Sequence, residues 1–384
     1  MKISRMARSI EPSLARKLFN MTKQYNDVVD LTLGDPDLKP NEIIRKAACD
    51  AAMAGKSRYS MNAGIVDLRT VYAKIFEEEY GLKADPATEV MVTVGGMEGL
   101  FLALACMLDE GDEVIIPAPY YVNYVQMVRM CGGKPVILYS TEEEGFHLDP
   151  DKVEAAVTDR TVAVIVNSPC NPTGEVLPEE VLARLADIAK KHDLTVISDE
   201  VYKTLVYDGK KHTSILNQPG MKERTILIDS LSKRFCMTGY RVGLAVGPAE
   251  LIANMTKMQE NVAACAPVPS QYAGVAAYEY CKVDEEARAT FEERRNFLCD
   301  AINAMPKLSC RKPGGTFYLF VNIEKTGLGA LDFCYKLLEN AHVAVVPGVT
   351  YGAEYENYVR IAFTHDISVL REGAERIRRF VETL

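Results

Sequence analysis

From about Glu89 the chain alternates short apolar runs with longer amphipathic stretches. Short runs rich in β-branched residues predict strands, and amphipathic stretches predict helices. The predicted strands cover 89–94, 113–117, 135–140, 161–168, 194–200, 225–228 and 242–246. The predicted helices between them cover 97–108, 120–131 and 178–193. Strands that are apolar at almost every position are buried on both faces of a sheet. The pattern therefore predicts an α/β fold whose large domain has a mostly parallel sheet of seven strands with helices on both sides.

The pattern changes beyond about Pro269. A long charged helix is followed by apolar runs at 317–323, 343–347 and 358–363 and by a final helix, which together predict a smaller α+β unit. The segment before Asn41 lacks the alternation and is expected to fold onto this unit or to reach across to a partner. We therefore predict a small domain built from the two chain ends. The predicted ranges are 1–45 for the N-terminal arm and part of the small domain, 46–285 for the large domain, and 286–384 for the small C-terminal domain.

Composition narrows the range of functions. The chain has 384 residues, of which 48% are hydrophobic and 25% are charged, as in ordinary globular proteins. A net charge of −9 argues against a nucleic-acid partner, because nucleic-acid binding needs a basic surface. No apolar run approaches the ~18 residues of a membrane span, and the first residues lack a signal-peptide pattern. Ten cysteines without CxxC pairs and five histidines without an HExxH pattern give no support for a metal site. We predict a cytoplasmic protein with no membrane partner and no metal.

Polar residues follow five of the predicted strands. In open α/β sheets ligands bind beyond the carboxyl ends of the strands. The first two of these ends carry a glycine pair (Gly95 and Gly96) and three closely spaced tyrosines (Tyr120, Tyr121 and Tyr124). The next two carry Asn171 in a turn and the carboxylate of Asp199. The last carries Lys233 together with Ser230, Ser232 and Arg241. Each feature alone has an ordinary structural explanation, such as a tight turn, side-chain packing or a solvated strand end.

Taken together, these groups match the requirements of one cofactor. Pyridoxal 5′-phosphate (PLP) needs an amine for its aldehyde, an acid for its ring nitrogen, donors for its O3′ atom and a cradle for its phosphate. A glycine turn that opens a helix suits the phosphate, because backbone N–H groups and the positive helix end can approach it. The sequence therefore predicts pyridoxal 5′-phosphate as cofactor.

Several motifs in this order resemble a known family, the fold-type I pyridoxal-phosphate enzymes, and within it the class I/II aminotransferases of the aspartate aminotransferase type. The motifs are LTLGDPD (31–37), SRYSMNAG (57–64), NSPCNPTG (167–174), SDEVY (198–202), SLSKRFCMTGYRVG (230–243), PGGTFY (313–318), VVPG (345–348) and YVRIAF (358–363). The resemblance covers nearly the whole chain. It implies the PLP-dependent transferase fold, an exchange of an amino group between an L-amino acid and a 2-oxo acid, and a homodimer with shared active sites.

The resemblance also implies roles for residues around the cofactor ring. Lys233 would anchor the cofactor covalently and carry protons during catalysis. Asp199 would pair with the protonated ring nitrogen, Tyr202 and Asn171 would bind O3′, and Tyr121 would stack on the ring.

The resemblance places other residues at the phosphate and at the substrate. The backbone N–H groups of Gly96 and Met97 would bind the phosphate together with Ser230, Arg241 and, from the neighbouring subunit, Tyr59. The substrate carboxylate would be bound by Arg360 with Gly34 and Asn171. Arginine is almost never fully buried without a partner, so Arg360 inside an apolar strand is itself hard to explain as structure alone.

One departure concerns the substrate. Many relatives carry a serine or threonine at position 97, and one aspartate-using branch carries a lysine, whereas this chain has Met97. Aspartate as preferred donor is therefore in doubt, and neutral or aromatic donors are expected to compete well. Two alternatives stay open: a β-eliminating C–S lyase on the same fold, and a cofactor-binding regulatory protein without turnover, against which Arg360 and Lys233 both argue.

Overall fold

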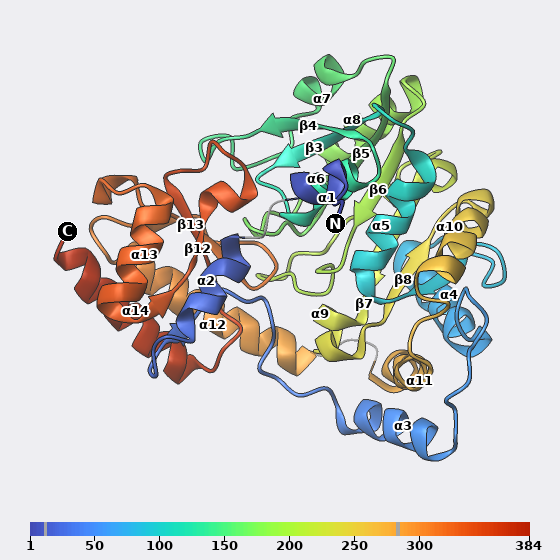
Figure 1. Ribbon diagram of the computed structural model, residues 1–384, viewed down its shortest axis with the longest axis horizontal. Helices are drawn as coiled ribbons and strands as arrows, with labels where there is room; N and C mark the ends of the chain where they lie inside the picture. Colours follow the sequence, from blue (N-terminus) through green and yellow to red (C-terminus); the bar gives the residue numbers. More distant parts are fainter. Residues whose placement is uncertain (11–13, 282–284) are drawn as a thin grey trace.

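A seven-stranded sheet forms the centre of the protein, in a computed structural model that describes residues 1–10, 14–281 and 285–384 (Figure 1). Its strands, in the spatial order β2-β8-β7-β6-β5-β3-β4, are β2 (Val90–Thr93), β8 (Gly243–Val246), β7 (Thr225–Ser230), β6 (Thr195–Asp199), β5 (Thr161–Asn167), β3 (Glu113–Ala118) and β4 (Lys134–Tyr139). Strands β3 to β7 are parallel, and β8 lies antiparallel to both β7 and β2. The predicted α/β class and the mostly parallel sheet are confirmed.

Helices cover both faces of this sheet. Neighbouring residues of a strand point to opposite faces, so an apolar strand packs against helices on both sides. On β7, Leu227 packs into the core beside α4, whereas Ile228 packs into the core beside α5. The helices of this part are α3 (Glu42–Met53), α4 (Val66–Tyr80), α5 (Gly95–Met107), α6 (Asn123–Met130), α7 (Pro150–Ala156), α8 (Glu179–Lys191), α9 (Leu231–Arg234), α10 (Ala249–Val262) and α11 (Val268–Ala276). Helix α6 begins three residues later than predicted, which leaves Tyr120 and Tyr121 in the preceding loop.

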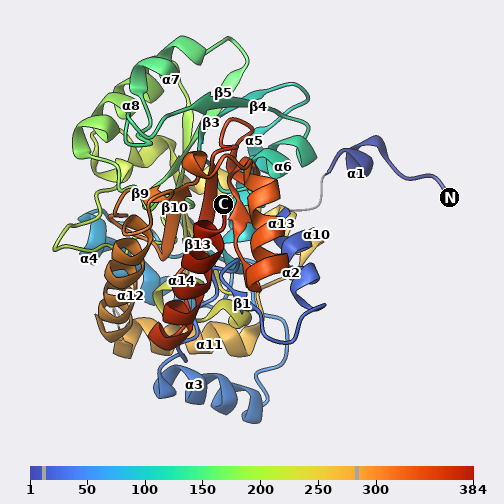
Figure 2. The same ribbon diagram turned by 90° about the vertical axis from the view of Figure 1, so that its left-hand side faces the viewer.

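A second, four-stranded antiparallel sheet is built from the C-terminal part of the chain. Its order is β12 (Val346–Pro347), β13 (Tyr358–Ala362), β10 (Tyr318–Asn322) and β9 (Ser309–Cys310), and the helices around it are α12 (Glu285–Asn303), α13 (Ala330–Ala341) and α14 (Ile367–Glu382) (Figure 2). The predicted strand 343–347 is divided, since β11 (Val343–Ala344) leaves the sheet and pairs elsewhere.

The N-terminal segment joins this smaller unit. Strand β1 (Val29–Asp30) pairs in parallel with β11, and the nearby helix α2 (Leu14–Thr22) lies against the same region. The shorter α1 (Arg5–Ser9) has no buried residues and stands apart from the body of the molecule (Figure 2). The smaller α+β unit is thus built from both chain ends, as predicted. The predicted boundary at 285 follows residues 282–284, which lie outside the described residues.

No helix in the described ranges is both long enough and apolar enough to span a membrane.

Candidate active site

A cavity of about 460 Å³ lies where the carboxyl ends of β5, β6 and β7 face the smaller sheet. Eleven of the twelve predicted site residues line it: Gly34, Gly96, Met97, Tyr121, Asn171, Asp199, Tyr202, Ser230, Lys233, Arg241 and Arg360. The twelfth, Tyr59, is 87% exposed and does not line the cavity of its own chain. Residues more than 300 positions apart, such as Gly34 and Arg360, therefore meet at one site.

Lys233 presents its amine to the cavity from the short helix α9. The Ser230 hydroxyl begins this helix by accepting the N–H of Ser232 at 3.2 Å. The Nζ atom of Lys233 donates to the carbonyl oxygen of Gly34 at 2.7 Å. Burial lowers the pKa of the Lys233 amine to about 8, with Arg360 and Arg241 acting in the same direction. A substantial fraction of the amine is therefore neutral near pH 8, which is the form that attacks an aldehyde.

Asp199 ends strand β6 as a buried carboxyl group. Its Oδ2 accepts the hydroxyl of Tyr124 at 2.5 Å, and its Oδ1 accepts the N–H of Val201 at 3.4 Å. Burial raises the pKa of Asp199 to about 6, while the Tyr124 hydrogen bond opposes that shift. A buried carboxylate held by neutral donors suits a cationic ligand atom, because a cation would favour its ionised form.

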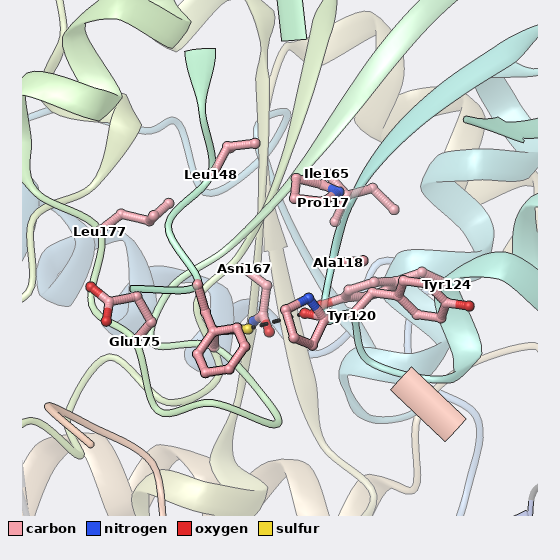
Figure 3. A pocket seen from close by; sticks show the side chains of 12 residues that line it. Pro117, Ala118, Tyr120, Tyr124, Leu148, Ile165, Asn167, Glu175 and Leu177 are labelled. Atoms are coloured by element: carbon pink, nitrogen blue, oxygen red, sulfur yellow. Dashed lines mark hydrogen bonds between the residues drawn. The ribbon is translucent and has the colours of Figure 1, made fainter. Parts of the chain in front are cut away.

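The side chain of Asn167 connects two of the predicted residues. Its Nδ2 donates to the backbone oxygen of Asp199 at 3.0 Å, and its Oδ1 accepts the N–H of Asn171 at 3.0 Å. Figure 3 shows Asn167 and Tyr124 on a second, smaller cavity of about 30 Å³, bordered by apolar side chains such as Leu177. At this size the second cavity admits a water molecule and no substrate. The residues around the second cavity therefore hold the residues of the larger site in place and do not bind substrate themselves.

Arg360 reaches the large cavity from the interior of strand β13, where it is 6% exposed. Its Nη1 donates to Oδ1 of Asn171 at 3.1 Å, and its Nη2 donates to the backbone oxygen of Thr32. The guanidinium carbon lies 4.2 Å from the ring centre of Tyr318 and 5.2 Å from that of Tyr351. The buried Nε makes no hydrogen bond to any residue that the structure describes. The guanidinium thus keeps donor capacity for an anionic ligand.

The opposite end of the cavity is built around Arg241 and the start of α5. Gly95 has φ +73°, and a Cβ atom there would lie 2.5 Å from Nη2 of Arg241. Only glycine allows the guanidinium to lie so close to this helix start. Arg241, the N-terminus of α5 and the Ser230 hydroxyl together form a positive, donor-rich corner that suits a phosphate.

Gly34 is a second position that requires glycine. A Cβ atom there would lie 1.7 Å from the hydroxyl of Tyr318. The close approach brings the Gly34 carbonyl to Lys233 and the smaller sheet to the edge of the larger one. Tyr318 also places its hydroxyl 3.1 Å from that of Tyr202.

Sequence reasoning did not assign roles to Tyr124, Asn167, Tyr318 and Tyr351. Tyr124 belongs to the tyrosine group after β3, and Tyr318 ends the PGGTFY motif, so both stand out in the chain as residues of interest. Their pairing with Asp199 and Tyr202 does not stand out, because these partners lie far away in the sequence.

The comparisons with known proteins agree with this site. Residues 26–377 match the family model described as aminotransferase class I and II. The chain is 40% identical to an aspartate aminotransferase of Pyrococcus abyssi, with 96% of each chain covered, and 38% identical to aromatic-amino-acid aminotransferase 2 of Thermococcus litoralis, with 100% and 99% covered. The solved structure of aspartate aminotransferase from Thermus thermophilus with maleate is 36% identical, covers 99% of this chain and 100% of its own, and has a TM-score of 0.94.

The chain belongs to the class I and II aminotransferase family. It is a transaminase, an enzyme that exchanges an amino group between an amino acid and a 2-oxo acid.

Proposed function

We propose that this aminotransferase uses pyridoxal 5′-phosphate and binds it in the 460 Å³ cavity. The observation that supports the proposal is the meeting of three groups there: the Lys233 amine with its lowered pKa, the buried Asp199 carboxylate, and the Arg241 guanidinium beside the glycine turn. These groups fit the aldehyde, the ring nitrogen and the phosphate of the cofactor.

When bound, the cofactor supplies a ring that withdraws electrons from the substrate α-carbon. Asp199 would hold the proton on the ring nitrogen, and Tyr202 and Asn171 would bind O3′. The ring of Tyr121, which lines the cavity, would stack on the cofactor ring. Arg360 binds the substrate carboxylate through two parallel hydrogen bonds and, with the backbone of Gly34, orients the α-carbon.

Lys233 then moves the proton. Its Nζ faces the cavity, where it would take the proton from the α-carbon of the amino acid donor and deliver it to the cofactor, and it would run the same transfer in reverse with the 2-oxo acid. The phosphate is held by Arg241, by Ser230 and by the N–H groups of Gly96 and Met97.

The absorbance of the purified enzyme tests the cofactor proposal. We expect an absorbance band of a lysine-linked cofactor that is lost in Lys233→Ala but present in Lys222→Arg, a conservative variant of a lysine that pairs with Glu89 outside the cavity. A purified protein without such a band after incubation with pyridoxal phosphate, or a Lys233→Ala variant that keeps it, would refute the proposal.

We further propose a homodimer in which Tyr59 completes the site of the partner. Its 87% exposure places it outside its own cavity, and other apolar side chains of the same stretch of chain, Met53, Met61 and Val66, are exposed as well. Large exposed apolar patches are typical of protein interfaces. A role at the phosphate requires Tyr59 to reach across such an interface.

Mixed dimers test this arrangement. Lys233→Ala and Tyr59→Ala homodimers should both be impaired, but a hybrid of the two has one site with both defects and one intact site. Unfolding and refolding the two variants together should restore activity well above that of either alone. A monomeric enzyme in analytical ultracentrifugation, or a mixture no more active than its average, would contradict the shared site.

For the substrate we propose a neutral or aromatic donor. Met97 lies 3.3 Å from both the Tyr121 hydroxyl and Nδ2 of Asn123, so an apolar thioether occupies this wall of the cavity. A panel of donors compared by kcat/KM tests this, and a large preference for aspartate would contradict it. Release of pyruvate and ammonia from a cysteine conjugate without a 2-oxo acid would instead indicate β-elimination.

We also retain the domain boundaries at 45/46 and 285/286 and a cytoplasmic location as proposals. Limited proteolysis with mass spectrometry tests the boundaries, and fractionation of cells tests the location.

A further inference from the structure

Four charged side chains form a buried cluster next to the active site. Lys203 is at its centre, with Nζ 2.8 Å from Oδ2 of Asp229 and 2.9 Å from Oε2 of Glu79. Arg234 places Nη1 2.6 Å from the other oxygen of Glu79. We call these four residues the Lys203 cluster. Two cations face two carboxylates, so the cluster is neutral, and Lys203, Asp229 and Arg234 are all buried.

The cluster joins segments that carry the proposed cofactor residues. Lys203 directly follows Tyr202 in the segment that begins with Asp199. Asp229 precedes Ser230 and accepts its N–H at 2.7 Å through Oδ1. Arg234 directly follows Lys233. The ring-binding segment and the lysine-bearing segment are thus held to each other by one ammonium group.

The third anchor of the cluster is helix α4, which lies on the face of the sheet away from α5. Glu79 comes from its last turn, and the hydroxyl of Tyr72 in the same helix donates to Oδ2 of Asp229 at 2.7 Å. Lys203 also donates to the Tyr80 hydroxyl at 2.9 Å, and Tyr80 donates to Glu200 at 2.8 Å. The oxygens that Lys203 contacts therefore come from α4 and from β7.

A buried ionic cluster of this kind is poorly explained by stability alone. Removing charges from water costs several kcal/mol per ion, and apolar replacements of whole buried pairs are often neutral or stabilising. What ion pairs and their hydrogen bonds supply is a defined geometry. The geometry defined here is that of the segments 199–203 and 229–234.

We propose that Lys203 is a positioning residue for the cofactor, which it does not touch itself. By holding Asp229 and Glu79 in place it sets the position of Ser230 and Lys233 relative to Asp199 and Tyr202. The proposal rests on the proposed cofactor site, because it concerns the alignment of the groups that would bind pyridoxal phosphate.

The test compares the release of pyridoxal phosphate from the holoenzyme in wild type and in Lys203→Met. Methionine keeps the approximate length of the side chain and removes the charge. We expect cofactor release to be faster by about tenfold, as for the loss of a coupling of about 1.4 kcal/mol between neighbouring groups. The absorbance of the lysine-linked cofactor, followed against pH, should have a shifted midpoint, because Lys233 would lose its set position relative to Asp199 and Tyr202.

Arg295→Met is the matched control. Arg295 is a fully buried cation of the smaller unit that pairs with Asp208 at 2.8 Å, and neither residue lines the active-site cavity or belongs to the Lys203 cluster. The variant should have a lower melting temperature without a change in the release rate or the pH midpoint. Equal changes in both variants would show a general loss of stability and would overturn the proposal, as would a Lys203→Met enzyme that releases cofactor at the wild-type rate.

A second variant covers the case in which Lys203→Met does not fold. Glu79→Gln keeps the shape of a side chain that is 26% exposed, and it removes the charge that joins Lys203 to Arg234. We expect about threefold faster cofactor release, and an unchanged rate would overturn the proposal. A wild-type enzyme that binds no pyridoxal phosphate would instead refute the proposed function, so the two failures are distinguishable.

Discussion

The two sheets of the protein contribute to the same cavity in different ways. The seven-stranded sheet contributes residues at or beyond the ends of parallel strands, such as Asp199 at the end of β6 and Ser230 at the end of β7. The four-stranded sheet contributes Arg360 from the middle of a strand and Tyr318 from the start of another. The carboxyl ends of neighbouring parallel strands bring many side chains to one edge of the sheet. A position inside an antiparallel strand contributes a single side chain, whose place is set by the strand pairing.

This difference indicates that the two sheets have separate roles at the site. In the proposed function, the larger sheet holds the groups that fit the cofactor, and the smaller sheet holds the cation that fits the substrate carboxylate. The two sets touch at few points, notably the hydrogen bond from Arg360 to Asn171 and the one from Lys233 to Gly34. Substitutions should therefore separate cofactor binding from substrate binding.

The largest effect is expected on the side of the larger sheet. Lys233→Ala should lower kcat by at least ~10⁴-fold, because the variant lacks the group that we propose as both covalent anchor and proton carrier. Single-turnover kinetics with an amino acid donor measure this loss. A variant within tenfold of the wild-type rate would remove Lys233 from the chemistry.

The next largest effect is expected on the side of the smaller sheet. Arg360→Leu should lower kcat/KM by about 10³-fold, since truncating a buried charged partner costs on the order of 4 kcal/mol. The release of cofactor should stay as in the wild type. Arg360→Lys is the control that retains the charge without the paired hydrogen bonds. Its kcat/KM should lie between those of Arg360→Leu and the wild type. If Arg360→Leu also released cofactor faster than the wild type, cofactor binding and substrate binding would not be separable.

A pH experiment tests the cofactor side more finely. The pKa of Asp199 is raised to about 6 by burial, so the carboxyl is ionised above that pH and protonated below it. Binding of pyridoxal phosphate to the cofactor-free enzyme should weaken as pH falls through 6, by about tenfold for each further unit. Tyr124→Phe removes a hydrogen bond that lowers this pKa, so its midpoint should lie at higher pH. If the midpoint of Tyr124→Phe is equal to or below that of the wild type, Asp199 is not the group that causes the pH dependence.

The smallest effect concerns substrate choice. Met97→Lys should raise kcat/KM for aspartate relative to a neutral donor by about tenfold, because it places a cation on an apolar wall of the cavity. Met97→Leu keeps the wall apolar and should leave the ratio nearly unchanged. If both variants shift the ratio equally, the charge at this position does not determine the preference.

Much of the fold is predictable from the chain because each element is coded locally. The uniformly apolar runs ending at Asn167, Asp199 and Ser230 predict strands buried on both faces, and they are strands β5, β6 and β7. The exceptions occur where tertiary contacts override the local pattern. The run 343–347 looks like one strand but is divided between two partners, β1 and β13.

The candidate site is predictable in part for the same reason. Ligand-facing residues follow strands, so the types and positions of Lys233, Asp199 and Asn171 can be recognised in the sequence. Tyr124 and Asn167 cannot be assigned in this way, because their roles depend on Asp199, which lies on another strand.

The sequence alone determined the alternation of elements, the α/β class and the identity of the groups at the strand ends, since these depend on local periodicity and residue chemistry. Tertiary structure alone decided which groups meet. It placed Arg360 beside Asn171, the Gly34 carbonyl at the Lys233 amine, and Lys203 between Asp229 and Glu79. Such pairs join positions far apart in the chain, and no local pattern specifies a distance across the fold.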